Sequence, residues 1–309
     1  ADATRYFANA LFGNLGLVII DADNSDLKRS FIPFAKDELL HQTSHKKVLE
    51  STEKLSAYNI QVNPREINLF YIEDNLRERI IFDNEKYKIN NTKIEFSESE
   101  ILDLLEKSPE KFSPNVIMRP LYEEVILPNL CYIGGGGELA YWLELKYYFD
   151  SAKVTFPILL LRNSVLLATE KQAKKADKLN LSWQDLFSKQ SDLVNTQTRK
   201  LSEFPVDLSE LKSQLQHQFD LLVSNANQTD PSFIGAVKAQ ETKQSKGLLN
   251  LEKRLLKAEK KKFKDVIERI TDLQNEMFPN KSLQERQVNF SEFYLENGEK
   301  LIPTIIENL

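Results

Sequence analysis

The sequence predicts an α/β protein that carries a small antiparallel β insert and a long α-helical coiled coil. Three observations support this fold class. Apolar strand-like runs stand beside helical patterns near residue 20 and again between residues 119 and 161, which is typical of α/β units. Short β-rich runs follow one another between residues 61 and 96. From about Ala168 onward, apolar residues recur every three or four positions, as in packed helices.

The N-terminal segment predicts half of an α/β unit. A short amphipathic helix is followed by a turn at Gly13 and Gly16 and by an apolar strand that ends at Asp21. An open sheet places ligand groups at the carboxyl ends of its strands, so Asp21 is a candidate binding residue. The alternative is that Asp21 and Asp23 cap a helix from Ser25 to Leu40.

A polar helix from Ser44 to Leu55 precedes the β-rich insert. His41 and His45 lie four residues apart, a spacing that can bind zinc, but no Cys or Glu accompanies them in a ligand arrangement. We therefore expect surface histidines and no metal site. Between Gln61 and Phe96, β-rich runs are separated by Asp-Asn and Asn-Asn pairs, which predicts an antiparallel meander. Such an insert can clamp a substrate or cover a sheet edge.

The helix that follows the insert has clear end signals. Ser97 and Glu100 have the spacing of a capping box, in which each residue satisfies an amide of the other. Pro109 ends the helix because proline cannot donate a backbone hydrogen bond.

The stretch from Arg119 to Lys146, RPLYEEVILPNLCYIGGGGELAYWLELK, holds four of the nine glycines. Gly134, Gly135, Gly136 and Gly137 lack a Cβ, so their main-chain N–H groups can approach a ligand closely. A helix that begins at this turn adds the positive end of its dipole. The sequence therefore predicts a site for an anion here.

The side chains beside the glycines suggest how such a site would work. Arg119 and Lys146 can bind phosphate or carboxylate charge. Glu124 or Glu138 can accept the proton of an amine nucleophile. These four are the candidate catalytic residues.

The same stretch also has a purely structural interpretation. Tyr141 and Trp142, which could form a flat wall for a base or sugar ring, could instead be core aromatics. Arg119 could form an internal ion pair with Glu123 or Glu124, and the glycines could permit close packing of a helix on a strand. The residues alone leave these interpretations open.

Two residues near the glycine run need separate interpretation. Cys131, the single cysteine, lies in an apolar run with no nearby histidine, so we expect a small buried side chain without a catalytic role. FPILLLRNSVLL predicts two apolar strands around Arg162. An arginine between buried strands usually has a function, which makes Arg162 a candidate binding residue.

The helical region includes a long helix from Phe233 to Met277, whose heptad-like apolar stripe has one skipped residue. Between Lys238 and Lys264 there are ten Lys or Arg and three Glu, a net charge of +7. This charge predicts a solvated coiled-coil face, a rim that attracts nucleotide phosphates, or an RNA-binding arm. Near the end, FSEFYLENG predicts a helix that Gly298 ends.

Composition limits the class of protein. The chain has 309 residues, 41% of them hydrophobic and 28% charged, and a formal charge of -5, which argues against general affinity for nucleic acid. The apolar runs are strand-sized, so we expect no membrane span, and we expect no signal peptide. A single cysteine excludes an intrachain disulfide and fits a reducing cytoplasm.

The composite string RPLYEE, LPN, YIGGGGELAYW and LK, at these spacings, resembles the bacillithiol-biosynthesis family BshC, the cysteine ligases that add cysteine to glucosaminyl malate. GNLGLVIIDADNSDLK, PILLLRNSVLL and the long helical segment follow in the order of that family. The resemblance implies a Rossmann-like core. This chain would hold only part of it, because the family's N-terminal portion has no counterpart in the sequence.

The resemblance implies a domain order. Residues 1–44 would end the Rossmann-like core, 45–110 would form the inserted β-rich module, and 111–168 would form the glycine-rich core segment. Residues 169–277 would form the coiled-coil domain, and 278–309 would return to the core.

The resemblance also implies a chemistry: a cytoplasmic carbon–nitrogen ligase that uses ATP or a related nucleotide. Its partners would be cysteine, glucosaminyl malate and a second copy of the chain bound through the coiled coil, with no membrane and no nucleic acid. The candidate binding residues are Asp21, Asn129, Tyr132, Gly134, Gly135, Gly136, Gly137, Tyr141, Trp142 and Arg162. The alternatives are a coiled-coil module that binds RNA or protein without catalysis, and an inactive fragment of the ligase.

Overall fold

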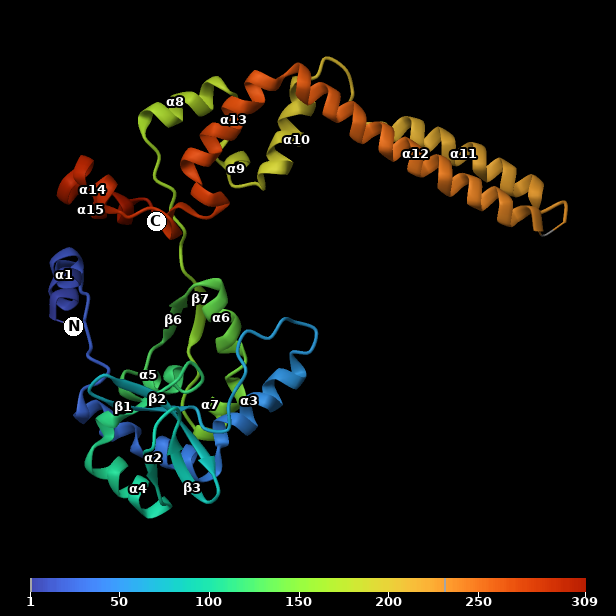
Figure 1. Ribbon diagram of the computed structural model, residues 1–309. Helices are drawn as coiled ribbons and strands as arrows, with labels where there is room; N and C mark the ends of the chain where they lie inside the picture. The colour runs from blue at the N-terminus through green and yellow to red at the C-terminus, as the bar shows by residue number, and fades with distance from the viewer. Residues whose placement is uncertain (1, 231) are drawn as a thin grey trace. The chain divides into compact units, whose positions relative to one another are not determined.

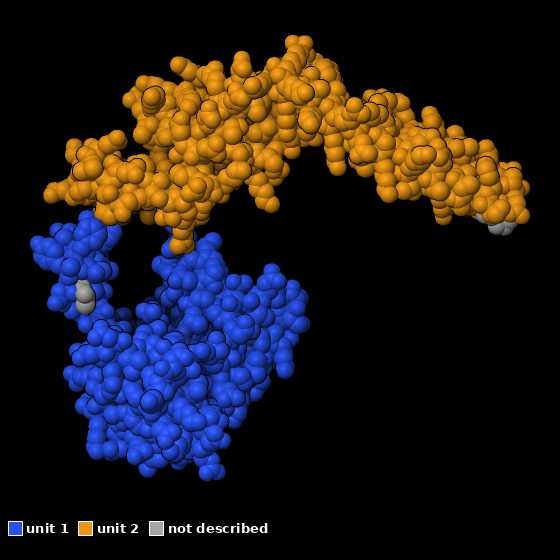
Figure 2. Space-filling view, in the orientation of Figure 1, with its two compact units in different colours: residues 1–163 blue, residues 164–309 orange. Residues whose placement is uncertain are grey.

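The computed structural model describes residues 2–230 and 232–309. The chain divides into two compact units, Ala1–Asn163 and Ser164–Leu309, which Figure 2 colours separately. Each unit contains its own cluster of buried apolar residues. Among the described residues, no helix is both long and apolar enough to cross a membrane.

Unit 1 combines two sheets with short helices (Figure 1). Its helices and strands are, in chain order, α1 (Asp2–Phe12), α2 (Ser25–His41), α3 (Thr43–Lys54), β1 (Leu69–Glu73), β2 (Leu76–Asp83), β3 (Lys86–Ile89), β4 (Glu95–Phe96), α4 (Glu98–Lys107), β5 (Phe112–Pro114), α5 (Arg119–Ile126), β6 (Cys131–Gly134), α6 (Gly136–Leu143), α7 (Lys146–Ala152) and β7 (Ile158–Leu161).

The larger sheet is antiparallel, with the strand order β4-β3-β2-β1-β5. Its hairpin turns contain Asn75 and Asn84 with φ of 59° and 51°, because tight hairpins need residues that tolerate positive φ. The predicted meander is confirmed. β5 was not predicted, since three residues are too few to show an alternating pattern.

One face of this sheet is buried against the helices of unit 1, and α2 supplies Phe31, Ala35 and Leu39 to the same core. The predicted capping box also forms: the Ser97 amide donates to Glu100 Oε2, and the Glu100 amide donates to Ser97 Oγ. Buried strand residues that alternate along the chain include Leu69, Tyr71, Ile80, Tyr87 and Ile89.

The smaller sheet consists of β6 and β7, which pair in parallel with Tyr132 opposite Leu159. α6 and α7 connect the two strands, as parallel pairing requires a crossover. Tyr132 and Leu159 face the core of unit 1, and the half-buried Cys131 lies in β6.

Three expectations about local structure are wrong. Residues 17–20 are largely exposed and lie outside the described strands, because they pair with no neighbouring strand. Asn24, and not Asp21 or Asp23, caps α2: its Oδ1 accepts hydrogen bonds from the amides of Asp26 and Leu27. The residues after β7 form no second strand, because no partner strand lies beside them in the described part of the chain.

Unit 2 is helical. Its elements are α8 (Glu170–Lys178), α9 (Trp183–Leu186), α10 (Gln190–Leu201), α11 (Ser209–Ala226), α12 (Ser232–Lys262), α13 (Lys264–Met277), α14 (Ser291–Asn297) and α15 (Leu301–Glu307).

α11 and α12 lie side by side as an antiparallel hairpin that extends from the remaining helices of unit 2 (Figure 1). The expected long helix is divided at Phe263, whose φ and ψ are -100° and 26°, in the region of the skipped residue in the apolar stripe. Gly298, with φ of 58°, ends α14 as predicted. Of the ten basic residues between Lys238 and Lys264, nine are exposed and Lys260 is half-buried.

Candidate functional site

Five of the residues predicted from the sequence line one cavity of about 520 Å³ in unit 1. We call it the Trp142 cavity. It lies where β2, the β5–α5 turn, α5, β6 and α6 meet. The predicted residues in its wall are Arg119, Tyr132, Glu138, Tyr141 and Trp142, and the others are Arg77, Pro114, Asn115, Val116, Pro120 and Glu123.

Local sequence explains how α5 presents Arg119. Asn115 Oδ1 accepts hydrogen bonds from the amides of Ile117 and Met118, at 2.8 and 3.4 Å, which holds the chain in a turn before the helix. Pro120 occupies the first turn of α5, where its missing N–H costs nothing. Arg119 is therefore the first residue of α5 and its side chain is exposed.

The aromatic wall is formed by stacked and closely packed rings. The rings of Tyr132 and Trp142 stack at a centroid distance of 4.1 Å, and Trp142 is fully buried. Phe156 packs edge-on against Trp142. Burial raises the pKa of Tyr141 to about 12, with a further contribution from Tyr132, so the phenol stays neutral at physiological pH.

The cavity contains charges of both signs. The Arg77 guanidinium lies 3.9 Å from the centre of the Phe70 ring, which fixes its position. Burial, followed by the neighbouring charge of Glu124, raises the pKa of Glu123, while Arg119 opposes this shift. Among the described residues, Arg119 forms no ion pair with Glu123 or Glu124. The proposed internal salt bridge is therefore not seen.

The glycine turn joins β6 to α6. Glu138 Oε2 accepts a hydrogen bond of 2.7 Å from the Gly135 amide, so this amide is already satisfied by the protein. Gly134 is buried, and a Cβ there would lie 2.6 Å from the Tyr132 ring. Gly136 and Gly137 are exposed, and a Cβ on either would meet nothing within 4 Å. The turn thus combines tight packing at its start with open backbone at its end.

Glu124 and Asn129 lie outside the cavity wall and bind each other. Glu124 is buried, and its two carboxylate oxygens accept hydrogen bonds from the amide and the Nδ2 of Asn129 at 2.8 and 2.9 Å. This arrangement closes the loop between α5 and β6 and uses the carboxylate that could otherwise accept a substrate proton.

The remaining predicted residues also lie elsewhere in unit 1. Lys146 is exposed and forms an ion pair with Asp150 one helical turn later. Asp21 accepts a hydrogen bond of 2.5 Å from Arg5. Arg162 follows β7, and its amide donates to the Gly134 carbonyl. None of the three lines the Trp142 cavity.

Arg77, Asn115 and Glu123 complete the cavity wall but were not among the predicted site residues. Arg77 comes from β2, more than 40 positions before the glycine turn, so no local spacing connects the two. Asn115 could have been found as the polar residue before α5. Glu123 adjoins Glu124, and only the helical rotation between them decides which carboxylate faces the cavity.

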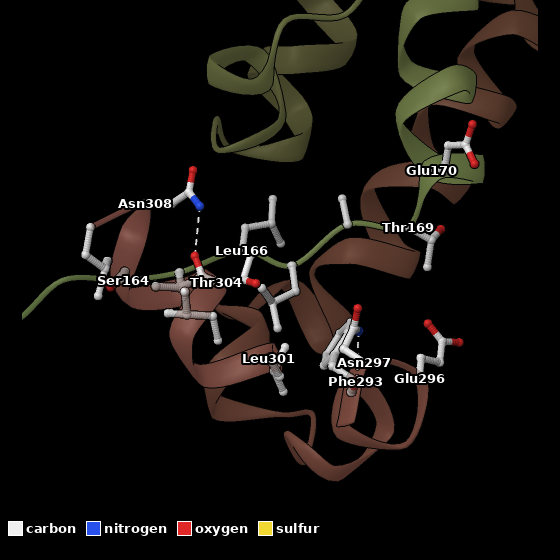
Figure 3. Close-up of a pocket in the computed structure, with 15 residues that line it drawn as sticks. Ser164, Leu166, Thr169, Glu170, Phe293, Glu296, Asn297, Leu301, Thr304 and Asn308 are labelled. Atoms are coloured by element: carbon white, nitrogen blue, oxygen red, sulfur yellow. Dashed lines mark hydrogen bonds between the residues drawn. The ribbon is translucent and has the colours of Figure 1, made fainter. Parts of the chain in front are cut away.

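A larger cavity of about 640 Å³ lies in unit 2, between the segment 164–170 and the helices α14 and α15 (Figure 3). Its wall mixes apolar and polar side chains, includes the carboxylates of Glu170 and Glu296, and has no Lys or Arg among the described lining residues. This composition does not suit an anionic substrate. The described residues also contain no cluster of three or more metal-ligating side chains.

Comparisons with known proteins agree with the two units. A family model described as "Bacillithiol biosynthesis BshC, N-terminal Rossmann-like domain" matches residues 1–163, and one described as "Bacillithiol biosynthesis BshC, C-terminal coiled-coil domain" matches residues 165–309. The predicted fold class is thereby confirmed.

Three relatives carry the name "Putative cysteine ligase BshC". The proteins of Flavobacterium johnsoniae, Flavobacterium psychrophilum and Christiangramia forsetii are 68%, 64% and 58% identical to this chain. Each alignment covers 100% of this chain, which spans 58% of the length of each relative. Both matched domains and these identities show that the chain belongs to the BshC family.

Proposed function

We propose that this chain forms part of a ligase that joins the carboxylate of L-cysteine to the amine of glucosaminyl malate, with the Trp142 cavity as the substrate site. Family membership supports the reaction class. One structural observation supports the site: two guanidinium groups, two carboxylates and a stacked aromatic wall surround the same cavity.

The charges of the cavity suit a substrate that carries both an amine and a carboxylate. Arg77 and Arg119 would bind a carboxylate through paired hydrogen bonds. Glu123 and Glu138 would hold an ammonium group, and the ring stack of Tyr132 and Trp142 would exclude water on one side.

Glu123 is the proposed proton acceptor. Amide formation requires the attacking amine to lose a proton, and a carboxylate with a raised pKa accepts that proton more readily. Burial raises the pKa of Glu123, whereas Glu138 is held by the Gly135 amide and Glu124 by Asn129. We therefore assign proton transfer to Glu123, and orientation of the substrate to Glu138.

Amide formation from a free carboxylate is unfavourable in water, so we propose that ATP or a related nucleotide supplies the activation. Arg77, Arg119 and the exposed glycines Gly136 and Gly137 would fit its negative charge. The Gly135 amide would not bind the nucleotide, because it already donates its hydrogen bond to Glu138.

We also propose that the hairpin of α11 and α12 mediates self-association. Apolar side chains remain exposed along it, including Leu211 and Leu221 at 49% and 55%. The RNA-binding alternative receives support only from the net charge of +7, and exposed lysines are equally expected on a solvated helix face.

The fluorescence of Trp142 offers a direct test of the cavity. In a Trp183→Phe background it would be the single tryptophan signal, since the chain has two tryptophans. Titration with L-cysteine, and then with glucosaminyl malate, should give a saturable change. Arg77→Gln and Arg119→Gln should weaken binding about tenfold or more, because a hydrogen bond to a charged group is worth about 1.5–3 kcal/mol.

Arg29→Gln, an exposed arginine of α2 outside the cavity wall, is the matched control and should bind normally. Mass spectrometry of reactions that contain ATP would detect the amide product. Equal weakening by Arg29→Gln and Arg77→Gln, or no saturable signal with either substrate, would reject the Trp142 cavity as the substrate site.

A further inference from the structure

A second, smaller cavity in unit 1 has a wall rich in cationic groups. It has a volume of about 350 Å³, and its polar lining residues are His45, Arg65, Glu66 and Arg79. We call it the arginine notch. His45 belongs to the first turn of α3, Arg65 and Glu66 to the segment before β1, and Arg79 to β2.

A buried polar network holds two sides of the notch together. Glu38, Ser44 and Asn68 are each at most 1% exposed. Glu38 Oε1 accepts hydrogen bonds from Ser44 Oγ at 2.7 Å and from the Asn68 amide at 2.8 Å. Asn68 Nδ2 donates to Ser44 Oγ at 2.7 Å. The start of α3 is therefore fixed against the segment before β1.

The same network fixes the backbone beneath Arg65. The Arg65 amide donates to Asn68 Oδ1 at 3.1 Å, and Asn68 Nδ2 donates to the Arg65 carbonyl at 2.7 Å. The third side of the notch is set by strand register, because Arg79 of β2 pairs with Phe70 of β1. Three separate chain segments, with their backbones fixed in this way, thus bring their residues to the wall of one cavity.

The polar side chains of the notch wall lack partners. Within residues 2–230 and 232–309, neither the Arg65 nor the Arg79 side chain forms an ion pair or a hydrogen bond, and His45 Nδ1 is buried without a partner. Other cations of unit 1 do find carboxylates, as Lys86 does with Glu95 and Lys111 with Glu73. Glu66 is the one carboxylate among the described residues of the notch wall.

We propose that the arginine notch binds a compact oxyanion, the phosphate or carboxylate group of a small molecule. Two guanidinium groups present planar pairs of N–H donors that match the oxygens of such a group. Arg65 starts from a backbone fixed by Asn68, so less ordering is needed when it binds. The site is separate from the Trp142 cavity, whose wall contains Arg77 and Arg119 instead.

Chemical protection tests the proposal on the unmodified chain. Phenylglyoxal modifies accessible arginines, and peptide mass spectrometry reports each position separately. Inorganic phosphate should slow modification of Arg65 and Arg79 and leave Arg29, an exposed arginine of α2, unprotected. Equal rates at Arg65 and Arg79 with and without phosphate would overturn the proposal.

Binding measurements on variants give a second test, in which some variants should bind phosphate more weakly and another more tightly. Arg65→Gln and Arg79→Gln should each weaken phosphate binding about tenfold or more in isothermal titration, because each removes a charged donor. Glu66→Gln should strengthen it, because it removes the negative charge from the wall. A loss of affinity in Glu66→Gln, or unchanged affinity in both arginine variants, would contradict the assignment.

Titrations with inorganic phosphate and with succinate distinguish the two sources of the oxyanion. The tighter ligand identifies whether the notch selects phosphate or carboxylate chemistry. Circular dichroism of every variant checks that the fold is retained, and the protection experiment decides the question if a variant fails to fold. Failure of both probes to bind the wild-type chain would overturn the proposal.

Discussion

The two sheets of unit 1 differ in how they are covered. In the antiparallel sheet, Leu69 and Ile80 are each 1% exposed. In the parallel pair, Ile133, Ile158 and Leu160 are 64%, 67% and 51% exposed. Parallel sheets normally have both faces covered, whereas an antiparallel sheet can be complete with one. The antiparallel sheet therefore has the covered face that it needs, whereas the parallel pair is covered on one face and exposed on the other.

This difference follows from how the strands are connected. Hairpins with short turns join β1, β2, β3 and β4, so four of the five strands of the antiparallel sheet lie close in sequence, and only β5 comes from further along the chain. β6 and β7 need a helical crossover, and any further strand beside them must come from a distant segment. The relatives are longer than this chain, which spans 58% of their length.

The largest predicted effect compares a buried leucine of the antiparallel sheet with an exposed leucine of the parallel pair. Leu69→Ala should cost about 2–5 kcal/mol of unfolding free energy, because it leaves a cavity in a packed core. Leu160→Ala should cost less than about 1 kcal/mol, because half of that side chain already contacts solvent. Urea denaturation monitored by circular dichroism measures both. Equal losses would mean that the two sheets are equally buried.

The glycine turn beside β6 gives the next largest contrast. Gly134→Ala should cost about 1–3 kcal/mol, because the new Cβ would lie 2.6 Å from the Tyr132 ring. Gly136→Ala is the matched control: its Cβ meets nothing within 4 Å and alanine favours the helix, so stability should not fall. Thermal unfolding of both variants measures the difference. A destabilised Gly136→Ala would show that the open end of the turn is packed.

The network beneath the antiparallel sheet predicts a dependence on pH. Burial raises the pKa of Glu38, despite hydrogen bonds from Ser44 and Asn68 that oppose the shift. The folded chain then holds this proton more tightly than the unfolded chain does. The contribution of Glu38 is therefore fully present below the ordinary glutamate range and is lost as pH rises through the folded pKa.

Glu38→Gln should flatten this decline, because glutamine does not titrate. The variant should also be less stable at low pH, since the glutamine oxygen can take the place of only one of the two accepting oxygens of Glu38 and its nitrogen accepts no hydrogen bond from Ser44. Urea denaturation across a pH series compares the two slopes. Identical slopes for variant and wild type would exclude Glu38 as their source.

The smallest expected effect on stability comes from substitutions on the exposed face of the parallel pair. Ile158→Ser combined with Leu160→Ser should leave the unfolding free energy nearly unchanged but lower the fluorescence of a bound hydrophobic dye, since it removes exposed apolar surface. Leu221 is an exposed leucine of α11, and Leu221→Ser is the control that measures how dye fluorescence changes when apolar surface is removed outside this sheet. Dye fluorescence equal to that of the wild type would show that this face does not bind the probe.

Patterns that depend on neighbours in sequence were predictable. The capping box of Ser97 and Glu100, the end of α14 at Gly298 and the hairpins with Asn75 and Asn84 all formed as expected, because each is closed by residues a few positions apart. The strand predicted at residues 17–20 did not form, because a strand needs a partner that local sequence does not supply.

The sequence by itself determined the fold class, the helix at the glycine turn and the aromatic and cationic character of the candidate site. Only the tertiary structure decided which charges face the Trp142 cavity. Arg77 arrives from a distant strand, while Lys146 pairs with Asp150 and Glu124 with Asn129. The physical reason is that residue type and helical spacing follow from the chain, whereas the partner of a charged group depends on elements brought together by packing.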